Sequence, residues 1–513
     1  MHRITSQHPQ PLFTSAATRC MEQAAAATLP RHTLMQRAGV AVARLAQALA
    51  PHARTVWIAC GPGNNGGDGL EAAMQLQRSG RQVFVTWLGH PDQAPADAMA
   101  SWQRAQACGV QWLDHPPAPS TAIDLCIDAL FGIGVSSSPT APARTPDARL
   151  VACLQALEHS PVPVLAVDLP SGLDADTGQF APGFAVVTHD HDARHSARAP
   201  RHTLSLLCLK PGFFTAAGRD AAGEVWLDDL GVAPASQAPS AWLSGPAPHV
   251  PRTHASHKGS YGDVAVVGGE GLADRGMGMA GAALLAASAA LHSGAGRVLV
   301  ALLDNGQLPL DTQQPELMFR HLDALDLPQL TVVCGCGGGQ AVRRVLVDVI
   351  AQSPRLVLDA DALNAIAASE ALHVEVTARS QRGQATVITP HPLEAARLLG
   401  CTTAQVQADR LAAAQQLADR LDCVVVLKGS GTVITAPGHL PTINPTGNAR
   451  LATAGTGDVL AGMIGAHLAA AAQRGACALR AAREAVYVHG QVADRWPDGQ
   501  ALTASALARA LVR

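Results

Sequence analysis

The stretch Asn448–Asp458, NARLATAGTGD, combines an anion-binding backbone with a carboxylate. Gly455, Thr456 and Gly457 lead directly into Asp458, and apolar residues then recur at helical spacing. We therefore expect a helix to begin here, where free backbone N–H groups and the helix dipole favour a phosphate. A carboxylate beside a phosphate is costly unless it acts as a base on a substrate hydroxyl. The alternative is an ordinary helix N-cap.

Two more segments of the second half suit a phosphorylated ligand. LKGSGT, residues 427–432, places Lys428 and two glycines after an apolar run, and TPHP holds His391 between two prolines. GCGGG, residues 335–339, follows another apolar run. All three stop where a doubly wound sheet binds ligands, at the carboxyl ends of its strands. Any one of them alone, such as His391, fits an ordinary loop equally well.

The first half has its own glycine-rich turn, GPGNNGGDG, at residues 61–69 after the run TVWIAC. Its glycines match the dinucleotide-binding spacing, but the next strand ends TWLG, without the acid that would hold a ribose. We therefore reject an ordinary dinucleotide-binding fold. The informative residues are Asn64, Asn65 and Asp68, whose polar side chains stand among glycines.

Two further strand ends of the first half carry oxygen-bearing side chains. IDALFGIG places Asp128 before the glycines at 132–134, and VDLPSGLDADTG places Asp168 and Ser171 at a turn. Oxygens from three neighbouring strand ends can surround a hard cation, which is monovalent if few of them are charged. Each aspartate alone could instead be a turn former.

These segments must be positioned by alternating strands and helices. Short apolar runs at 55–60, 82–88, 123–130 and 162–168 alternate with helical patterns, and a second series runs from 264 to 427. Such alternation indicates parallel sheets. Proline, alanine and serine dominate the stretch between the two series. The sequence therefore predicts two doubly wound α/β domains, residues 1–232 and 250–513, joined by a linker over 233–249.

Composition excludes several classes of partner. The 513 residues carry a net charge of −3, so nothing marks a surface for nucleic acid or anionic membranes. Eleven scattered cysteines without CxxC pairs indicate a reduced, cytoplasmic protein. The N-terminus has no signal core, and the apolar run 276–291 is short for a membrane span. We expect a cytoplasmic homo-oligomer without membrane or nucleic-acid partners.

The motifs NNGGDG, DALFG and DLPSGLDADTG resemble those of the NAD(P)H-hydrate epimerase family, over residues 10 to 232. The resemblance implies a Rossmann-like three-layer domain in which Asp168 contacts the substrate and shuttles its proton. It also implies a potassium ion on Asn65, Asp128 and Ser171. The hydrate site would comprise Asn64, Asn65, Gly66, Gly67, Asp68, Gly132, Ile133, Gly134, Val135, Ser136, Ser137 and Ser138. The loop 133–138 departs from the family, and so does an insertion around HDHDARHSARAP, whose three histidines fit no tight metal site.

HKGSYG, GAALLAASAAL, DADALN, TPHP, VVVLKGSGT and NARLATAGTGDVLAGMIGA are similar to the ADP-dependent NAD(P)H-hydrate dehydratases, a ribokinase-like family, over residues 250 to 495. The resemblance implies that Asp458 acts on the hydrate hydroxyl, with magnesium present. Ala282, Gly339 and His391 would contact the hydrate. ADP would be held by Lys428, Gly429, Ser430, Gly431, Thr432 and Gly457. One departure is GCGGG, where the family has Gly-Pro-Gly-Leu-Gly.

Together the resemblances imply a bifunctional enzyme acting on NAD(P)H hydrates. The first domain would interconvert the R and S hydrates, and the second would dehydrate the S form with ADP. Two alternatives stay open. One is a ribokinase-like small-molecule kinase with an N-terminal ligand-binding module, and the other is a first domain that binds potassium without turnover.

Overall fold

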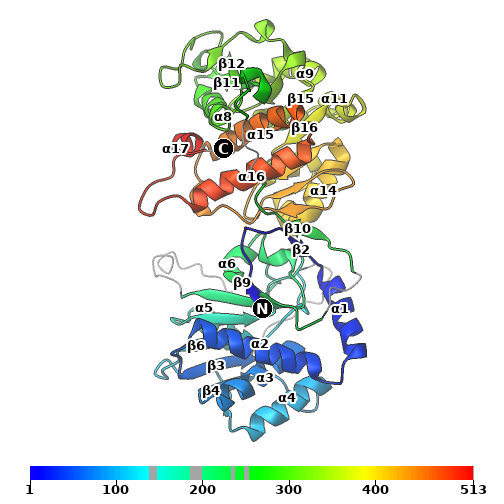
Figure 1. Ribbon diagram of the computed structural model, residues 1–513, viewed down its shortest axis with the longest axis vertical. Coiled ribbons are helices and arrows are strands. Elements are labelled where there is room, and N and C mark those ends of the chain that lie inside the picture. Colours follow the sequence, from blue (N-terminus) through cyan, green and yellow to red (C-terminus); the bar gives the residue numbers. More distant parts are fainter. Residues whose placement is uncertain (138–146, 185–198, 233–236, 248–252, 512–513) are drawn as a thin grey trace. The chain divides into compact units, whose positions relative to one another are not determined.

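The computed structural model describes residues 1–137, 147–184, 199–232, 237–247 and 253–511 (Figure 1). The described chain forms two units by its internal contacts. The first comprises Met1–Thr5 and Pro11–Ala241, and the second comprises Ser6–Gln10 and Trp242–Arg513. Each unit is built on its own sheet. Among the described residues, no helix is both long and apolar enough to span a membrane.

The first sheet has eight strands in the described chain, in the order β1-β9-β8-β7-β6-β3-β4-β5. All neighbours are parallel except β1 and β9. The strands are β1 (His2–Arg3), β3 (Thr55–Cys60), β4 (Gln82–Trp87), β5 (Gln111–Leu113), β6 (Leu125–Ala129), β7 (Val164–Val167), β8 (Arg201–Leu206) and β9 (Glu224–Asp228). The helices are α1 (Ser15–Thr28), α2 (Thr33–Leu49), α3 (Asn64–Arg78), α4 (Ala96–Ala107), α5 (Ala148–Glu158) and α6 (Gly218–Ala222).

Helices cover both faces of this sheet. Along β3, Val56 and Ile58 pack with α2 and α3, whereas Trp57 and Ala59 pack with α5 on the opposite face. Alternate residues of a strand point to opposite faces, so a strand covered on both sides is apolar throughout. That is the pattern of TVWIAC, and it confirms the predicted doubly wound α/β class for this unit.

The second sheet has eleven strands in the described chain, in the order β13-β12-β11-β14-β15-β16-β17-β18-β19-β10-β2. The strands are β2 (Gln10–Leu12), β10 (Ala241–Leu243), β11 (Asp263–Glu270), β12 (Arg297–Leu303), β13 (Met318–Phe319), β14 (Thr331–Cys334), β15 (Arg355–Leu358), β16 (Ala385–Ile388), β17 (Val424–Leu427), β18 (Val433–Thr435) and β19 (Thr442–Ile443). The helices are α7 (Leu272–Arg275), α8 (Ala280–His292), α9 (Val342–Gln352), α10 (Asp361–Ala367), α11 (Glu370–Gln381), α12 (Pro392–Leu399), α13 (Thr403–Ala408), α14 (Arg410–Leu421), α15 (Thr456–Gln473), α16 (Ala478–Asp494) and α17 (Ala504–Arg509).

This sheet is also covered on both faces, which confirms the α/β class for the second unit. Val264 and Val266 of β11 pack with α8, α15 and α16, and Ala265 and Val267 pack with α9, α10 and α14. The strands from β12 through β11 and β14 to β17 are parallel, so their carboxyl ends meet at one edge. The loops that carry the predicted second site leave from that edge.

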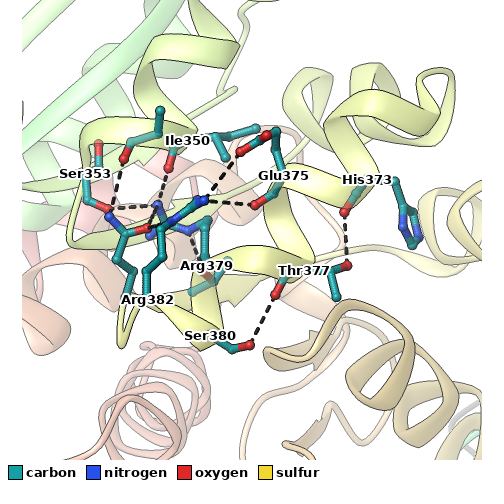
Figure 2. Close-up of polar contacts among 11 residues, drawn as sticks. Ile350, Ser353, His373, Glu375, Thr377, Arg379, Ser380 and Arg382 are labelled. Carbon is teal, nitrogen blue, oxygen red and sulfur yellow. Dashed lines mark hydrogen bonds and ion pairs between the residues drawn. The ribbon is translucent and has the colours of Figure 1, made fainter.

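A buried arginine ties together elements on the α11 side of this unit. Figure 2 shows Arg379 of α11 with Ile350 and Ser353. Its guanidinium donates to the carbonyl oxygens of Ile350, Ser353 (2.8 Å) and Ala385 (3.1 Å), and to Thr386 Oγ1 at 2.8 Å. Burial lowers the pKa of Arg379 to about 10. Because Ile350 and Ser353 lie at the end of α9, the cation satisfies carbonyls that this helix leaves free.

The helices α8 and α15 approach each other through small residues. A Cβ atom on Gly462 would lie 1.9 Å from the carbonyl oxygen of Ala286, well inside van der Waals contact. Buried alanines of both helices belong to the core on this face of the sheet. The backbones can come this close only because Gly462 has no side chain. This contact fixes the helix whose first turn carries Asp458.

Gly462→Ala should lower the free energy of unfolding of the second unit by about 3 kcal/mol, because the added methyl group must push two helix backbones apart. Gly281→Ala in α8 is the matched control, since nothing lies within 4 Å of its Cβ position. Helix propensity predicts that this control gains up to about 1 kcal/mol. Urea unfolding measures both variants. Equal stabilities would contradict the close approach of the two helices.

One part of the architecture differs from the sequence-based expectation. The stretch 233–249 was expected to be a linker, yet Ala241–Leu243 form β10, whose Trp242 pairs with Thr442 of β19. At the other end of the chain, Ser6–Gln10 belong to the second unit, and Tyr487 Oη donates to the carbonyl oxygen of Ser6 at 3.0 Å. The chain therefore passes between the two units three times, near residues 5, 10 and 241.

Candidate functional site

The first unit contains a cavity of about 700 Å³. It is lined by loops that follow β3, β6 and β7 and by residues of α1 and α2. These loops carry the residues that the sequence singled out for the hydrate site. The predicted residues that line the cavity are Asn64, Asn65, Asp68, Gly132, Ile133, Gly134 and Asp168.

Two other predicted residues, Gly66 and Gly67, do not line the cavity but are buried beneath it. A Cβ atom on Gly66 would lie 2.0 Å from the carbonyl oxygen of Gly61, and one on Gly67 would lie 2.6 Å from Met35 Cε. Their role here is close packing of the first turn of α3, which begins at Asn64. The structure therefore places Asn64, and not Gly66, in the lining of the cavity.

Asp168 is held by a buried lysine. Lys210 is fully buried, and its Nζ donates to Asp168 Oδ1 at 2.5 Å, to Ser205 Oγ at 3.1 Å and to the carbonyl oxygen of Leu206 at 2.9 Å. The backbone N–H of Leu206 also donates to Asp168 Oδ1, at 3.2 Å. The second oxygen, Oδ2, lies 3.1 Å from the Cβ position of Gly132, a cavity residue. One carboxylate oxygen is thus anchored and the other is directed toward the cavity.

The structure brings together two of the three predicted potassium ligands. The carboxylate of Asp128 accepts hydrogen bonds from Ser171 Oγ (2.5 Å), from the N–H of Ser171 (2.9 Å) and from the N–H of Leu130 (3.2 Å). Burial raises the pKa of Asp128 above its ordinary value, and the hydrogen bonds from Ser171 offset only part of this rise. Asn65 Oδ1 lies 3.2 Å from the Cβ position of Gly132, while its buried Nδ2 has no hydrogen-bond partner in the described chain.

The predicted loop 133–138 is held by Arg19, which no motif indicated, and by Asp174 of the motif DLPSGLDADTG. Arg19 donates to the carbonyl oxygen of Ile133 at 2.8 Å, and Val135 is buried in the core. Ser137 donates through its N–H (2.7 Å) and Oγ (3.0 Å) to Asp174. Ser136 is exposed, and Ser138 lies outside the described residues. The inserted histidines 189, 191 and 195 also lie outside them.

In the second unit, α15 begins at Thr456, as the sequence predicted, with Gly455 at its N-cap in the left-handed region (φ 90°). Thr456 Oγ1 donates to the carbonyl oxygens of Leu451 (2.7 Å) and Thr453 (2.9 Å), which fixes the turn before the helix. His489 Nε2 donates to the carbonyl oxygen of Thr456 at 3.0 Å. The open N–H groups of this first turn are free to meet an anion.

Four side chains meet in front of this helix. Donor atoms of Cys336, Asp359 and Asp458 all lie within 4.8 Å of one another, and Lys428 Nζ donates to Asp359 Oδ1 at 2.7 Å. Burial, and then the neighbouring Asp359, raise the pKa of Asp458 to about 6. Burial also raises the pKa of Cys336 well above its ordinary value, so it stays a thiol. Lys428 lies next to the helix start, 3.5 Å from the Cβ position of Gly457.

His391 begins α12 as its N-cap. Its Nδ1 accepts from the N–H groups of Leu393 (3.1 Å) and Glu394 (3.2 Å), and Nε2 lies 3.2 Å from Glu394 Oε1. The N–H of His391 donates back to Glu394 Oε2 at 2.8 Å, which completes a capping box. Burial raises the pKa of Glu394 to about 7. Part of the role of His391 is therefore structural, although its side chain is 46% exposed.

The remaining predicted residues lie on neighbouring loops. The N–H of Gly339 donates to Asp361 Oδ2 at 2.8 Å, and buried Glu270 accepts from the N–H groups of Gln340 (2.9 Å) and Ala341 (3.0 Å). Ala282 of α8 packs against this glycine-rich loop at Gly337. The turn between β17 and β18 carries Lys428, Gly429, Ser430, Gly431 and Thr432.

Comparisons with known proteins cover both units. The NAD(P)H-hydrate dehydratase model matches residues 266–513, and the model of the YjeF-related protein N-terminus matches residues 31–212. The bifunctional NAD(P)H-hydrate repair enzyme Nnr of Escherichia coli is 35% identical over 472 residues, which cover 86% of this chain and 81% of the relative. Nnr of Coxiella burnetii is 35% identical over 485 residues, 91% of each chain. The chain belongs to the bifunctional NAD(P)H-hydrate repair enzyme family.

Solved structures similar to this member of the repair-enzyme family include the ADP/ATP-dependent NAD(P)H-hydrate dehydratase of Bacillus subtilis, co-crystallised with ATP and Mg²⁺. It is 29% identical, covers 51% of this chain and 91% of its own, and has a TM-score of 0.40.

Several polar residues of this repair-enzyme chain were missed by the motif analysis. Glu22 of α1 lines the first cavity, and Lys210 holds Asp168. Glu394 adjoins His391. Asp359 begins the quoted motif DADALN but was given no role there, and it joins Lys428 to the second site. One signal could have found Lys210: the chain has only three lysines among its 37 lysine and arginine residues, and a second of them is Lys428. Glu22 lies in an alanine-rich helix that offers no comparable signal.

Proposed function

We infer that this chain repairs hydrated nicotinamide nucleotides in two steps. The first domain epimerises the R and S hydrates, and the second dehydrates the S form with ADP, giving AMP and phosphate. The observation that carries this function is the alignment with bifunctional repair enzymes across both units at 35% identity. The site geometry supports it, because each unit places a carboxylate at the carboxyl ends of its strands.

The chemistry of dehydration explains the second site. Hydration leaves a hydroxyl on C6 of the nicotinamide ring, and hydroxide is a poor leaving group. Transfer of the terminal phosphoryl group of ADP to this oxygen makes it leave as phosphate, and loss of a proton from C5 then forms the double bond of the dihydropyridine. Asp458 takes the hydroxyl proton while the first turn of α15 and Lys428 stabilise the charge on the transferring group. The turn 428–432 holds the nucleotide, and Gly339, Ala282 and His391 face the hydrate.

Magnesium fits this site through oxygen donors. Asp359 and Asp458 offer carboxylates within 4.8 Å of each other, and the phosphates of the nucleotide supply further oxygens. The protonated thiol of Cys336 is too soft a ligand for this ion. When bound, magnesium neutralises charge that develops on the phosphates. We propose ADP as the natural phosphoryl donor.

Potassium fits the first domain. The carboxylate of Asp128 accepts a hydrogen bond from Ser171 Oγ, so these oxygens lie together at two strand ends. Asn65 Nδ2 has no hydrogen-bond partner in the described chain, so rotation of the Asn65 amide can direct either its oxygen or its nitrogen toward the ion. One buried carboxylate with neutral oxygens suits a monovalent cation. Bound there, potassium would order the loop that leads from β6 into Gly132. We also propose domain limits of 1–232 and 250–513, with Ser6–Gln10 and Trp242–Leu243 as additional segments of the second unit. A cytoplasmic location and a homo-oligomeric state complete the proposal.

Asp128→Ala should weaken potassium activation of epimerisation by at least about tenfold, because it removes the charged oxygen of the site. Dehydration of pure S hydrate by the same variant should keep its wild-type rate. Potassium titration of the epimerisation rate is the measurement, with sodium as the competing ion. An unchanged potassium dependence would remove this cation site from the proposal.

The two-step function is tested with full-length variants, since residues 6–10 belong to the second unit and simple fragments would lose them. With ADP and magnesium, the Asp168→Asn chain should consume the S form of mixed hydrates and then stall. Adding the Asp458→Asn chain, which is inactive in dehydration, should restore complete conversion. Chiral chromatography follows both epimers. No ADP-dependent loss of hydrate, or accumulation of a stable phosphorylated product, would instead support a small-molecule kinase.

A further inference from the structure

The cavity of the first domain contains a carboxyl group that the motifs leave without a role. One face of α1 forms part of the cavity wall, and Glu22 stands in its middle, one turn from Thr18 and from Ala26. The charged groups that act on Glu22 are Asp168, Lys210 and Arg19, and they act through space and not through hydrogen bonds. The Glu22 carboxyl is therefore available to a ligand in the same cavity as Asp168.

The two carboxyl groups have opposite surroundings. The carboxylate of Asp168 accepts hydrogen bonds from the buried Lys210 ammonium and from the N–H of Leu206. Glu22 accepts no hydrogen bond from a cation or a backbone N–H in the described part of the chain, and burial, followed by the charge of Asp168, raises the pKa of Glu22. Two further carboxyl groups line the cavity: burial raises the pKa of Asp68 well above its ordinary value, and Asp97 lies 3.4 Å from His32 Nδ1. A proton acceptor and a proton donor thus line one cavity.

The chemistry of the hydrate requires such a pair. C6 carries both the hydroxyl group and the ring nitrogen N1, so inversion must break either C6–O or C6–N1. Loss of hydroxide would give the iminium ion, which loses a C5 proton to form the dihydropyridine without any phosphoryl donor. An epimerase that passed through this ion would make the dehydratase unnecessary. Breaking C6–N1 avoids it, but N1 must then be protonated as it leaves.

We propose that Glu22 is the general acid of epimerisation and Asp168 its general base, an assignment that rests on the epimerase activity proposed above. Asp168 removes the hydroxyl proton, the C6=O bond forms, and the C6–N1 electron pair moves to N1, which takes the proton of Glu22. Rotation about C5–C6 presents the other face of the aldehyde. N1 then attacks C6, returns its proton to Glu22, and the oxygen regains a proton from Asp168.

Glu22→Gln tests the assignment in the full chain. The change keeps the size of the side chain but removes its acidic proton, so kcat of epimerisation should fall by about 100-fold or more while KM changes by less than about threefold. The wild-type rate should fall at high pH as Glu22 ionises, and this alkaline limb should be absent from the variant. Glu22→Asp, which keeps the acid, should recover part of kcat and the alkaline limb. Equal loss in both variants would overturn the assignment in favour of a packing role.

Three further outcomes separate this assignment from the underlying function. Both Glu22 variants should dehydrate pure S hydrate with ADP at the wild-type rate. If Glu22→Gln epimerises the hydrate with the wild-type kcat, Glu22 is not the general acid. A wild-type chain that fails to epimerise at all would overturn the proposed function itself. In ¹⁸O-labelled water, ring opening predicts that C6 inverts faster than ¹⁸O enters the C6 hydroxyl group. Entry of one ¹⁸O atom for each inversion would overturn C6–N1 cleavage.

Discussion

Asp458→Asn should reduce ADP-dependent dehydration by about 10³-fold, a loss typical of removing a general base. The amide keeps the shape of the carboxylate but cannot take the hydroxyl proton at the first turn of α15. In the wild type, the pKa of Asp458 is raised to about 6, so the base is ionised above that pH and protonated below it. Dehydration should accordingly fall about tenfold per pH unit below pH 6.

The same Asp458→Asn preparation contains its own control, because epimerisation in the first domain should proceed at the wild-type rate. Steady-state rates on pure S hydrate between pH 5 and 8 provide the measurement. The residual activity of the variant should lack the acid limb. A variant that dehydrates at near wild-type rate would show that another group accepts the proton.

Lys210→Met should lower the free energy of unfolding of the first domain by about 3–5 kcal/mol, because it leaves the carboxylate of Asp168 buried without its cation. The exposed Lys258 offers a matched control, and Lys258→Met should change stability by less than about 0.5 kcal/mol. Chemical unfolding followed by the tryptophans of the first domain measures the effect.

A double variant gives the decisive comparison for the Lys210–Asp168 pair. Lys210→Met with Asp168→Asn removes the uncompensated charge as well as the cation, so it should recover a large part of the lost stability. If the losses of the two single variants simply add, the two groups are not coupled in the folded protein.

Local sequence patterns predicted several elements of this structure. TVWIAC became β3 with the bounds the sequence suggested, and α15 begins within the Gly-Thr-Gly-Asp turn. Both follow from neighbouring residues: an apolar run buried on two faces, and small residues before a helical repeat. The glycine-rich turn at 61–69 also contributes to the cavity wall, and Gly66 packs closely against Gly61 within this turn.

Features that depend on distant partners were not visible in the sequence. The carboxyl of Glu22 matters only because α1 packs over loops from residues 64 to 168, and nothing in SAATRCMEQAAAAT indicates this. Similarly, β10 has three residues and gains its strand character from pairing with β19, 200 residues later. Cys336 lies in the second site because of the way its loop folds, and its proximity to Asp458 could not be predicted from the sequence GCGGG alone.

The placement of Ser6–Gln10 in the second unit has a consequence for synthesis of the chain. The ribosome releases this segment long before the rest of the second unit, and its contact with Tyr487 joins residues that are 481 positions apart. At about 5–20 residues per second, the partner emerges about 25 to 95 s later. The first unit, whose last residue is Ala241, is complete long before then. Residues 6–10 therefore spend most of translation as an unpaired segment between two parts of the first unit, and the second unit closes after the first.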